Sequence, residues 1–247
     1  MKIATYNIWN DEAGMPLRFQ QIAEEIKKIN ADIMCLQEVS DYEQHSNLAL
    51  ICKYFYSHYQ AQTGLSILSK LPIYDMADFE SGTMAYVKFN KTTLLVINVH
   101  LPWESVFARE KIIVDIVKRL PVQTNNITFL LGDFNSAADS SIHRFLTNQQ
   151  SLLECDAYFY DLAEVSAEIM GVNVPATLNF RKNPRWGVVQ PKNTIEVNRR
   201  FDWIMLKNPY PLEFPELKQC SLFGTSISEK TGLAASDHYG VFVEIEI

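Results

Sequence analysis

The sequence predicts an α/β fold in which helices alternate with strands that pair largely in antiparallel fashion. Helical and strand-like hydrophobic patterns mix along the whole chain. Between residues 65 and 99 several strand-like runs follow one another, and consecutive hairpins imply antiparallel pairing. The 247 residues are 47% hydrophobic, which is enough to bury a sizeable core, and no linker divides them. We therefore expect residues 1–247 to form one domain.

The chain opens with a predicted strand, helix and second strand. Residues 3–9 form the first strand pattern, and apolar residues then recur at helical spacing up to Ile29, behind a favourable helix start at Pro16. The short apolar run 33–36 reads as a buried strand that delivers Glu38 at its end. A second helix is expected over residues 47–56.

The middle of the chain predicts a hairpin followed by a helix. Asn90 and Lys91 have the character of a tight turn that pairs residues 84–89 with residues 93–99. A helix is expected over residues 104–120, because its apolar positions share one face and two basic residues favour its C-terminal dipole.

The last part of the chain has weaker patterns. Residues 127–131 read as a strand that stops at Gly132, and the final strands are expected over residues 201–206 and 239–245. Residues 177–200 show no sustained period. A loop of this length in a compact domain is usually functional or mobile.

Charge and composition exclude several classes of protein. The 29 acidic residues outnumber 22 basic ones, and the net charge of −7 argues against broad adhesion to nucleic acid or to anionic membranes. A locally recognised phosphate substrate stays open. We find no export signal, no apolar stretch long enough to cross a membrane and no cysteine framework. We expect a soluble cytoplasmic protein with no stable membrane association and no obligate protein partner.

Polar residues at strand ends carry the chemical signal. Asp133 and Asn135 are two residues apart, so an extended backbone would point both to one side, and Asn98 and His100 share this spacing. Glu38 is a hard oxygen ligand suited to Mg²⁺ or Mn²⁺. These residues predict a site at the end of a sheet.

The C-terminal third adds two acids and a histidine. Asp237 is a second candidate metal ligand and stands beside His238, before the closing strand. Asp202 is an acid within an apolar strand and needs a partner. A carboxylate that orients a histidine and stabilises its charged form meets that need.

Six short motifs, in this order, resemble the endonuclease/exonuclease/phosphatase superfamily. They are Thr5-Tyr6-Asn7, Leu36-Gln37-Glu38-Val39, Asn98-Val99-His100-Leu101, Gly132-Asp133-Phe134-Asn135, Phe201-Asp202-Trp203 and Ser236-Asp237-His238. The resemblance implies a four-layer α/β sandwich of two mixed, largely antiparallel β-sheets flanked by helices. It also implies cleavage of phosphate esters with Mg²⁺ or Mn²⁺ as cofactor.

The same resemblance implies roles for eight residues. Three would lie at the metal: Asn7, Glu38 and Asp237. Five would be catalytic: His100, Asp133, Asn135, Asp202 and His238. In this assignment Asp133 positions or activates water, Asn135 contacts phosphate, and His238 pairs with Asp202 at the phosphate. His100 would be a second acid or electrostatic donor.

The motifs address phosphate and metal, whereas specificity depends on variable loops. The leading hypothesis is a phosphodiesterase or nuclease that acts on a phosphate-ester substrate, with DNA and RNA among the candidates. The alternatives are a phosphatase, a sphingomyelinase-type phosphodiesterase, or a non-catalytic module that binds a phosphorylated ligand.

A basic segment, residues 181–200, has two open interpretations. It contains six basic residues and one acid, Glu196. This composition is typical either of a solvated loop or of an arm that binds substrate. In the second interpretation arginines would bind phosphate and Trp186 would stack or pack. We expect His45, His58 and His143 to have surface or packing roles.

Overall fold

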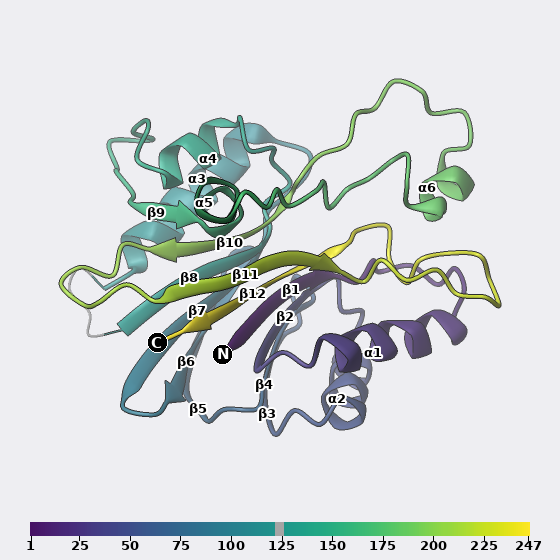
Figure 1. Cartoon of the computed structure of the whole chain (residues 1–247), viewed down its shortest axis with the longest axis horizontal. Helices are drawn as coiled ribbons and strands as arrows, with labels where there is room; N and C mark the ends of the chain where they lie inside the picture. The colour runs from purple at the N-terminus through teal and green to yellow at the C-terminus, as the bar shows by residue number, and fades with distance from the viewer. Residues whose placement is uncertain (122–125) are drawn as a thin grey trace.

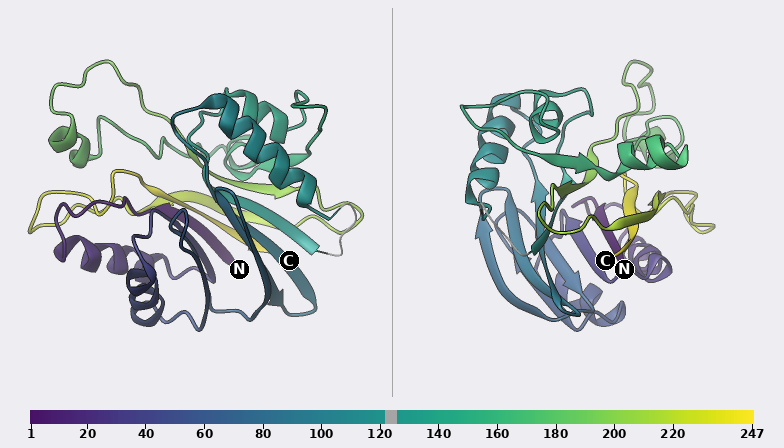
Figure 2. Two further views of the ribbon diagram at one scale, coloured as in Figure 1. Left: turned by 180° about the vertical axis from the view of Figure 1, so that it is seen from behind. Right: turned by 60° about the vertical axis from the view of Figure 1, so that its left-hand side comes forward.

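Two six-stranded β-sheets pack face to face between layers of helices (Figures 1 and 2). The computed structural model describes residues 1–121 and 126–247. Its four layers confirm the predicted sandwich. Sheet A has the strand order β11 (Glu216–Phe223), β12 (Gly240–Glu246), β1 (Lys2–Asn7), β2 (Ile33–Gln37), β4 (Leu65–Ser69) and β3 (Tyr56–Gln60). Sheet B has the order β5 (Ile73–Phe79), β6 (Gly82–Phe89), β7 (Thr92–His100), β8 (Asn126–Asp133), β10 (Asp202–Lys207) and β9 (Phe159–Asp161).

Each sheet has a parallel pair at its centre and antiparallel neighbours around it. In sheet A the parallel pair is β1 and β2, and in sheet B it is β7 and β8. The other neighbours in the described part of both sheets are antiparallel. The carboxyl ends of both parallel pairs therefore offer the places where a site can form.

The helices cover the outer faces of the sheets. Sheet A is covered by α1 (Leu17–Ile29) and α2 (Tyr42–Ile51), and sheet B by α3 (Val106–Arg119) and α4 (Ser141–Leu146). Two further helices are α5 (Leu162–Met170), which contacts β10 and β11, and α6 (Pro184–Val189). Within residues 1–121 and 126–247, no helix combines the length and apolar character that a membrane crossing requires.

The core follows from side-chain alternation along the central strands. In β1, Ile3 packs between the sheets, whereas Ala4 and Tyr6 pack beneath α1 and α2. In β7, Val96 faces sheet A and Ile97 faces α3 and α4. Strands that are buried on both faces read as continuous apolar runs, which is why the sequence predicts them well.

The helix expected over residues 47–56 is wrong in its boundaries. α2 begins earlier because the side chain of Asp41 caps it, accepting a hydrogen bond from the backbone N–H of Gln44 at 2.7 Å. It ends at Ile51, and Tyr56 already belongs to β3. The expected strand 127–131 likewise continues through Gly132 to Asp133.

The structure contains further elements that the sequence pattern does not predict: β3, β9, β11 and the helices α4, α5 and α6. In β11 the register shifts between Leu217 and Gln219, and this irregularity breaks the alternation from which a strand is recognised. α6 lies within residues 177–200, where no sustained period was found. At six residues, it is too short to show one.

His45 on α2 is buried and joined to two strands. Its Nδ1 lies 2.8 Å from Ser66 Oγ and its Nε2 lies 3.1 Å from Ser57 Oγ. Burial lowers the pKa of His45 to about 4, and the nearby His58 adds to this effect. The folded protein therefore holds a neutral imidazole that the unfolded chain would protonate at mildly acidic pH.

Because His45 is buried as a neutral imidazole, we expect the free energy of unfolding to fall as the pH is lowered. Between pH 6.5 and about 4 the unfolded chain binds the proton and the folded chain does not, so the free energy of unfolding decreases as the pH falls. The loss attributable to His45 is on the order of 3 kcal/mol. Urea denaturation across this range should show a shallower pH dependence for His45→Gln than for the wild type. Parallel pH profiles in the two proteins would contradict the assignment.

Candidate active site

The residues singled out from the sequence meet at one edge of the sandwich. Asn7 ends β1 and Glu38 directly follows β2, while His100 and Asp133 end β7 and β8 as paired neighbours. Asp202 begins β10 directly opposite Asp133. The carboxyl ends of the two parallel pairs thus supply four of the eight predicted residues.

Asp133 lies at the centre of this group. Asn7 Nδ2 donates to Asp133 Oδ2 at 3.0 Å and to Glu38 Oε1 at 2.9 Å, so one amide joins carboxylates from both sheets. The backbone N–H of Trp9 donates to Asn7 Oδ1 at 3.0 Å and fixes the orientation of that amide. Asn7, Glu38 and Asp133 therefore form one hydrogen-bonded unit.

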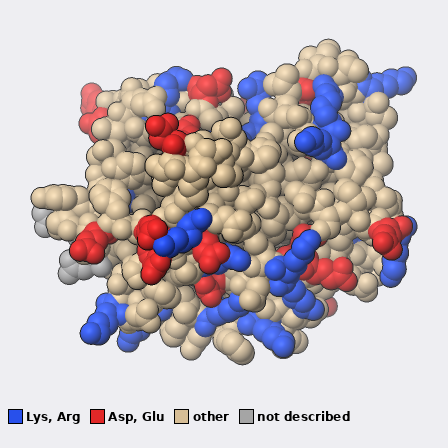
Figure 3. Space-filling model, viewed as in Figure 1, with Lys and Arg blue, Asp and Glu red and all other residues tan. Residues whose placement is uncertain are grey.

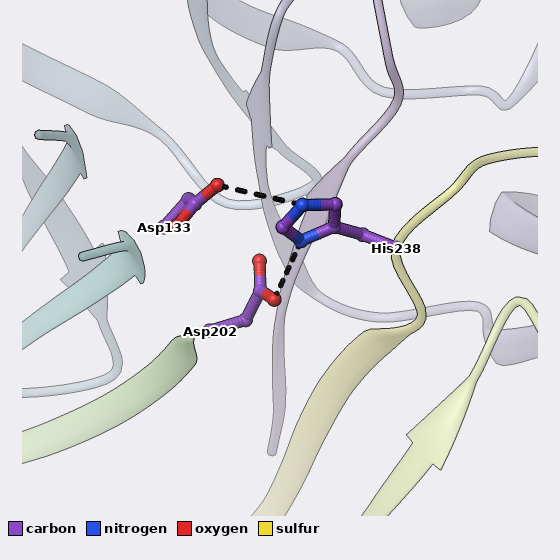
Figure 4. A group of neighbouring side chains, drawn as sticks. All are labelled: Asp133, Asp202 and His238. Atoms are coloured by element: carbon purple, nitrogen blue, oxygen red, sulfur yellow. Dashed lines mark hydrogen bonds and ion pairs between the residues drawn. The ribbon is translucent and has the colours of Figure 1, made fainter. Parts of the chain in front are cut away.

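Two imidazoles approach Asp133. His238 Nε2 lies 3.9 Å from Asp133 Oδ2, and its Nδ1 lies 2.9 Å from Asp202 Oδ2 (Figure 4). His100 Nε2 lies 3.8 Å from Asp133 Oδ2 and also 3.8 Å from Glu38 Oε1. The Asp133 carboxylate is therefore within 4 Å of both rings.

The electrostatics of the site favour a charged His238. The pKa of His238 is raised well above its usual value although burial opposes this, because the carboxylates of Asp202, Asp133 and Asp237 stabilise the cation. Burial raises the pKa of Asp202, and the His238 charge works against that rise. The buried carboxylate of Asp202 is thus hydrogen-bonded to His238, which is the kind of partner that its burial requires.

The predicted metal ligands form an oxygen-rich set. Asp237 is half-buried, and its pKa is raised by loss of solvent, by Glu38 and by Asp133. Loss of solvent is the largest cause of this rise, and the two neighbouring carboxylates add negative charge that a divalent cation would offset. The carboxylates of Glu38 and Asp237 fit the ligand preference of Mg²⁺ or Mn²⁺, whereas Asn7 directs its Nδ2 at Glu38 and its Oδ1 accepts from the N–H of Trp9. Asp133, Asp202 and His238 form a second group, whose ligand atoms lie within 4.8 Å of one another.

Asn135 is not on an extended backbone, and the expectation that it parallels Asp133 is wrong. Asn135 has φ +46°, and its N–H donates to Asp133 Oδ1 at 2.8 Å. Its Nδ2 donates to the carbonyl of Leu101 at 2.8 Å. The chain turns after Asp133, so Asn135 reaches the same edge by a turn and orients the central carboxylate.

The expectation that Asn98 lies at the site beside His100 is also wrong. Although it shares a strand with His100, it is fully buried between the sheets. Its Nδ2 donates to the carbonyls of Leu36 and Ser66 at 2.9 and 3.0 Å, and its Oδ1 accepts from Gln37 Nε2 at 2.6 Å. Asn98 therefore connects the sheets beneath the site, and the sequence analysis gave no role to its partner Gln37.

The backbone at the site is unusual at several points. Trp9 and Glu38 have φ near +60°, a left-handed conformation that costs about 1–2 kcal/mol in a residue with a side chain. Gly132 has φ +140°, and a Cβ there would lie 2.0 Å from the carbonyl oxygen of Val99. Glycine therefore permits the close approach of β8 to β7 immediately before Asp133.

The basic segment resolves into internal and exposed cations. Arg181 donates to the carbonyls of Asn193 and Glu196, and Arg200 forms an ion pair with Asp161 at 2.7 Å. Arg185 is 4% exposed, which contradicts a phosphate-binding role for it. Arg181 is nevertheless exposed, as are the three remaining basic residues, Lys182, Lys192 and Arg199. Blue side chains accordingly gather at the upper right of Figure 3, where Figure 1 shows the loop around α6.

The histidines outside the motifs have the expected surface or packing roles. His143 is buried with its Nε2 2.9 Å from Asp161 Oδ2, and His58 pairs with Asp78 at 2.7 Å near the surface. Asp161 also pairs with Arg200, and its pKa is lowered overall, because burial raises it while the contacts with His143 and Arg200 lower it by more. These contacts stabilise the fold away from the central carboxylate.

Fold and site together define a class. A two-sheet sandwich whose edge carries carboxylates, amides and imidazoles fits a metal-dependent hydrolase of phosphate esters. The chain belongs to the Endonuclease/Exonuclease/phosphatase family, whose model matches residues 4–238. This family generally uses divalent metals.

One curated relative is the probable CCR4-Not complex 3'-5'-exoribonuclease subunit Ccr4 of Vairimorpha ceranae (strain BRL01). It is 26% identical over 231 residues, and the match covers 67% of this chain and 48% of the relative. The chain thus spans about half the length of this relative.

Several solved structures share the fold. TDP2 of D. rerio, complexed with single strand DNA product, has a TM-score of 0.78 and 17% identity, with 100% of this chain and 99% of that chain covered. An endonuclease/exonuclease/phosphatase family protein from Leptotrichia buccalis C-1013-b has a TM-score of 0.70 and 18% identity over 100% of both chains. Beta toxin of Staphylococcus aureus has a TM-score of 0.69 and 17% identity, with 99% of each chain covered.

Proposed function

We propose that the chain hydrolyses phosphodiesters, with Mg²⁺ or Mn²⁺ as cofactor and water as the nucleophile. The observation that carries this proposal is the position of Asp133, between an amide at 3.0 Å and two imidazoles at 3.8 and 3.9 Å. A carboxylate held in this way is suited to orient a water and accept its proton.

The roles of the other residues follow from their contacts. Asn7, Glu38 and Asp237 would hold a divalent cation, which would supply Lewis-acid stabilisation of phosphoryl and leaving oxygens. His238, charged and held by Asp202, donates to the phosphate as negative charge develops on it. His100 offers a second donor on the other side of Asp133.

Nucleic acid is the proposed substrate class. The Ccr4 relative is described as an exoribonuclease, and the TDP2 neighbour was solved with a single strand DNA product. Both descriptions concern phosphodiesters of nucleic acid. The alternatives are a phosphatase and a lipid-directed phosphodiesterase. A comparison of substrates distinguishes them from a nuclease.

A substrate panel with metal control tests the proposal. Bis-p-nitrophenyl phosphate, single-stranded and duplex DNA, RNA, nucleotides, inositol phosphates and sphingomyelin would each be incubated with Mg²⁺, with Mn²⁺ and with EDTA. We expect metal-dependent release from the diester and from at least one nucleic acid. Turnover confined to monoesters or to sphingomyelin would contradict the nuclease assignment, and no turnover on any ester would favour a binding module.

Substitution of Glu38 tests the metal site directly. Glu38→Gln keeps the side-chain shape but replaces one carboxylate oxygen with an amide nitrogen, which cannot ligate a cation. We expect Mn²⁺ affinity, measured by calorimetry without substrate, to fall by about 100-fold, the upper range for changes around a metal ligand. Glu43→Gln, an exposed acid on α2, is the matched control and should bind Mn²⁺ like the wild type.

A further inference from the structure

The segment that carries α6 is anchored on the loop that carries Asp237 and His238. Figures 1 and 2 both place α6 beside the yellow loop that leads into β12. Three side chains make this contact, and we call them the α6 brace: Asn183, Arg185 and Trp186. We call residues 234–238 the metal loop. The α6 brace contacts its backbone at Ala234, Ser236 and Asp237.

Each member of the α6 brace donates to backbone carbonyls of the metal loop. Asn183 Nδ2 donates to the carbonyls of Ser236 and Asp237 at 2.9 and 3.0 Å. Trp186 Nε1 also donates to the Asp237 carbonyl at 3.0 Å. Arg185 Nε donates to the carbonyl of Ala234 at 3.0 Å. The carbonyl of a proposed metal ligand thus receives two donors from one short helix and its cap.

The contacts to the Ser236 and Ala234 carbonyls are buried, and those to the Asp237 carbonyl are partly buried, so they constrain the loop. Asn183 and Arg185 are 2% and 4% exposed. Removing Asn183 would take the donor from the buried Ser236 carbonyl, and removing Arg185 would take it from the Ala234 carbonyl, which is costly in a buried site. Asn183 Oδ1 also accepts from the N–H of Arg185 at 3.0 Å, so it caps α6 and holds the loop at once.

The brace also reaches the other loop of the site. The Arg185 guanidinium lies 4.9 Å from the centre of the Trp9 ring, and the N–H of Trp9 orients Asn7. Within the metal loop, Ser236 Oγ donates to the Asn7 carbonyl at 2.7 Å and accepts from the N–H of His238 at 3.2 Å. The brace therefore connects the metal loop, which carries Asp237, with the segment after β1, whose Trp9 orients the proposed ligand Asn7.

We propose that the α6 brace positions Asp237 and His238 for metal binding and phosphate hydrolysis, and that its members do not contact the substrate themselves. This inference rests on the proposed function, and it assigns a role to a segment outside the sequence motifs. It differs from a substrate arm, because Arg185 is buried and directed at a backbone carbonyl.

Two substitutions separate positioning from packing. Trp186→Phe removes the Nε1 donor and keeps a ring to pack on Phe180, which lies 4.7 Å away between ring centres. Asn183→Ser keeps an oxygen that can cap α6 and removes both donors to the metal loop. The two variants act on the same loop from different residues, so either one tests the proposal if the other fails to fold. Val188→Ser, at an exposed position of α6, is the matched control.

The readouts are thermal stability, Mn²⁺ affinity by calorimetry without substrate, and turnover of bis-p-nitrophenyl phosphate. We expect folded variants in which Mn²⁺ affinity falls about tenfold, with a parallel loss of kcat, and a control like the wild type. Wild-type Mn²⁺ affinity and kcat in folded variants would overturn the proposal. So would a loss confined to oligonucleotide substrates, since that result would place the brace at the substrate.

Failure of the proposed function has a different signature. A wild type that binds Mn²⁺ but cleaves no ester, with variants that bind Mn²⁺ more weakly, would refute the hydrolase and retain the positioning role. An active wild type with unaltered variants would refute positioning alone. A wild type that does not bind Mn²⁺ would refute both.

Discussion

Asp133→Asn is expected to lower kcat by about 10³-fold, within the range for a positioned acid–base group. The substitution keeps the shape of the side chain, and an amide oxygen can still accept from the N–H of Asn135. It removes the basic oxygen that lies between His100 and His238, and it places an amide nitrogen where Asn7 needs an acceptor. Steady-state kinetics on bis-p-nitrophenyl phosphate with saturating metal would measure the loss.

The control for this experiment is Asp139→Asn, an exposed acid on the loop that follows β8. It carries the same chemical change without contact to the proposed site and should keep wild-type kcat. Thermal denaturation of both variants separates loss of chemistry from loss of fold. If Asp133→Asn keeps kcat within a few-fold of wild type, the central role of Asp133 is refuted.

His238→Ala is expected to lower kcat by about 10²- to 10³-fold, as removal of one electrostatic donor does elsewhere. The substitution removes the His238 imidazolium, which Asp202, Asp133 and Asp237 stabilise and which we propose donates to the phosphate. Because the donor acts on charge that develops in the transition state, KM should change far less than kcat.

Two results bear on the His238 assignment. His58→Ala, which removes a histidine of β3 outside the site, should leave kcat unchanged. A variant of His238 that raises KM while keeping kcat would show that this histidine binds substrate equally in the ground and transition states. That outcome would reassign His238 from stabilisation to binding.

Much of the fold was accessible from hydrophobic periodicity, because the central strands are buried on both faces and α1 and α3 each present one apolar face. β1, β2 and the hairpin of β6 and β7 were predicted for this reason. The edge strand β11 escaped because an irregularity disturbs its alternation, and α2 was misplaced because its cap at Asp41 was overlooked.

The candidate site was accessible as a set of residues, because six ordered motifs name them. Its geometry was not accessible from spacing. Asn135 adopts a left-handed turn that depends on the Leu101 carbonyl, which comes from another strand end. Arg185 is buried against Ala234, 49 positions away, so the basic residues around it in the sequence do not indicate its contacts. Roles set by distant partners cannot be read from neighbouring residues.

The buried contact between Gln37 and Asn98 has a consequence for how the site reaches its working shape. Thr5 shares the amide of Gln37, so three polar side chains on three strands satisfy one another only when sheets A and B stand in one alignment. Any sliding of one sheet over the other would leave these amides unpaired in an apolar core. The two halves of the edge that carries the candidate site are therefore aligned when the chain folds, and ligand binding does not have to supply the free energy for bringing them together.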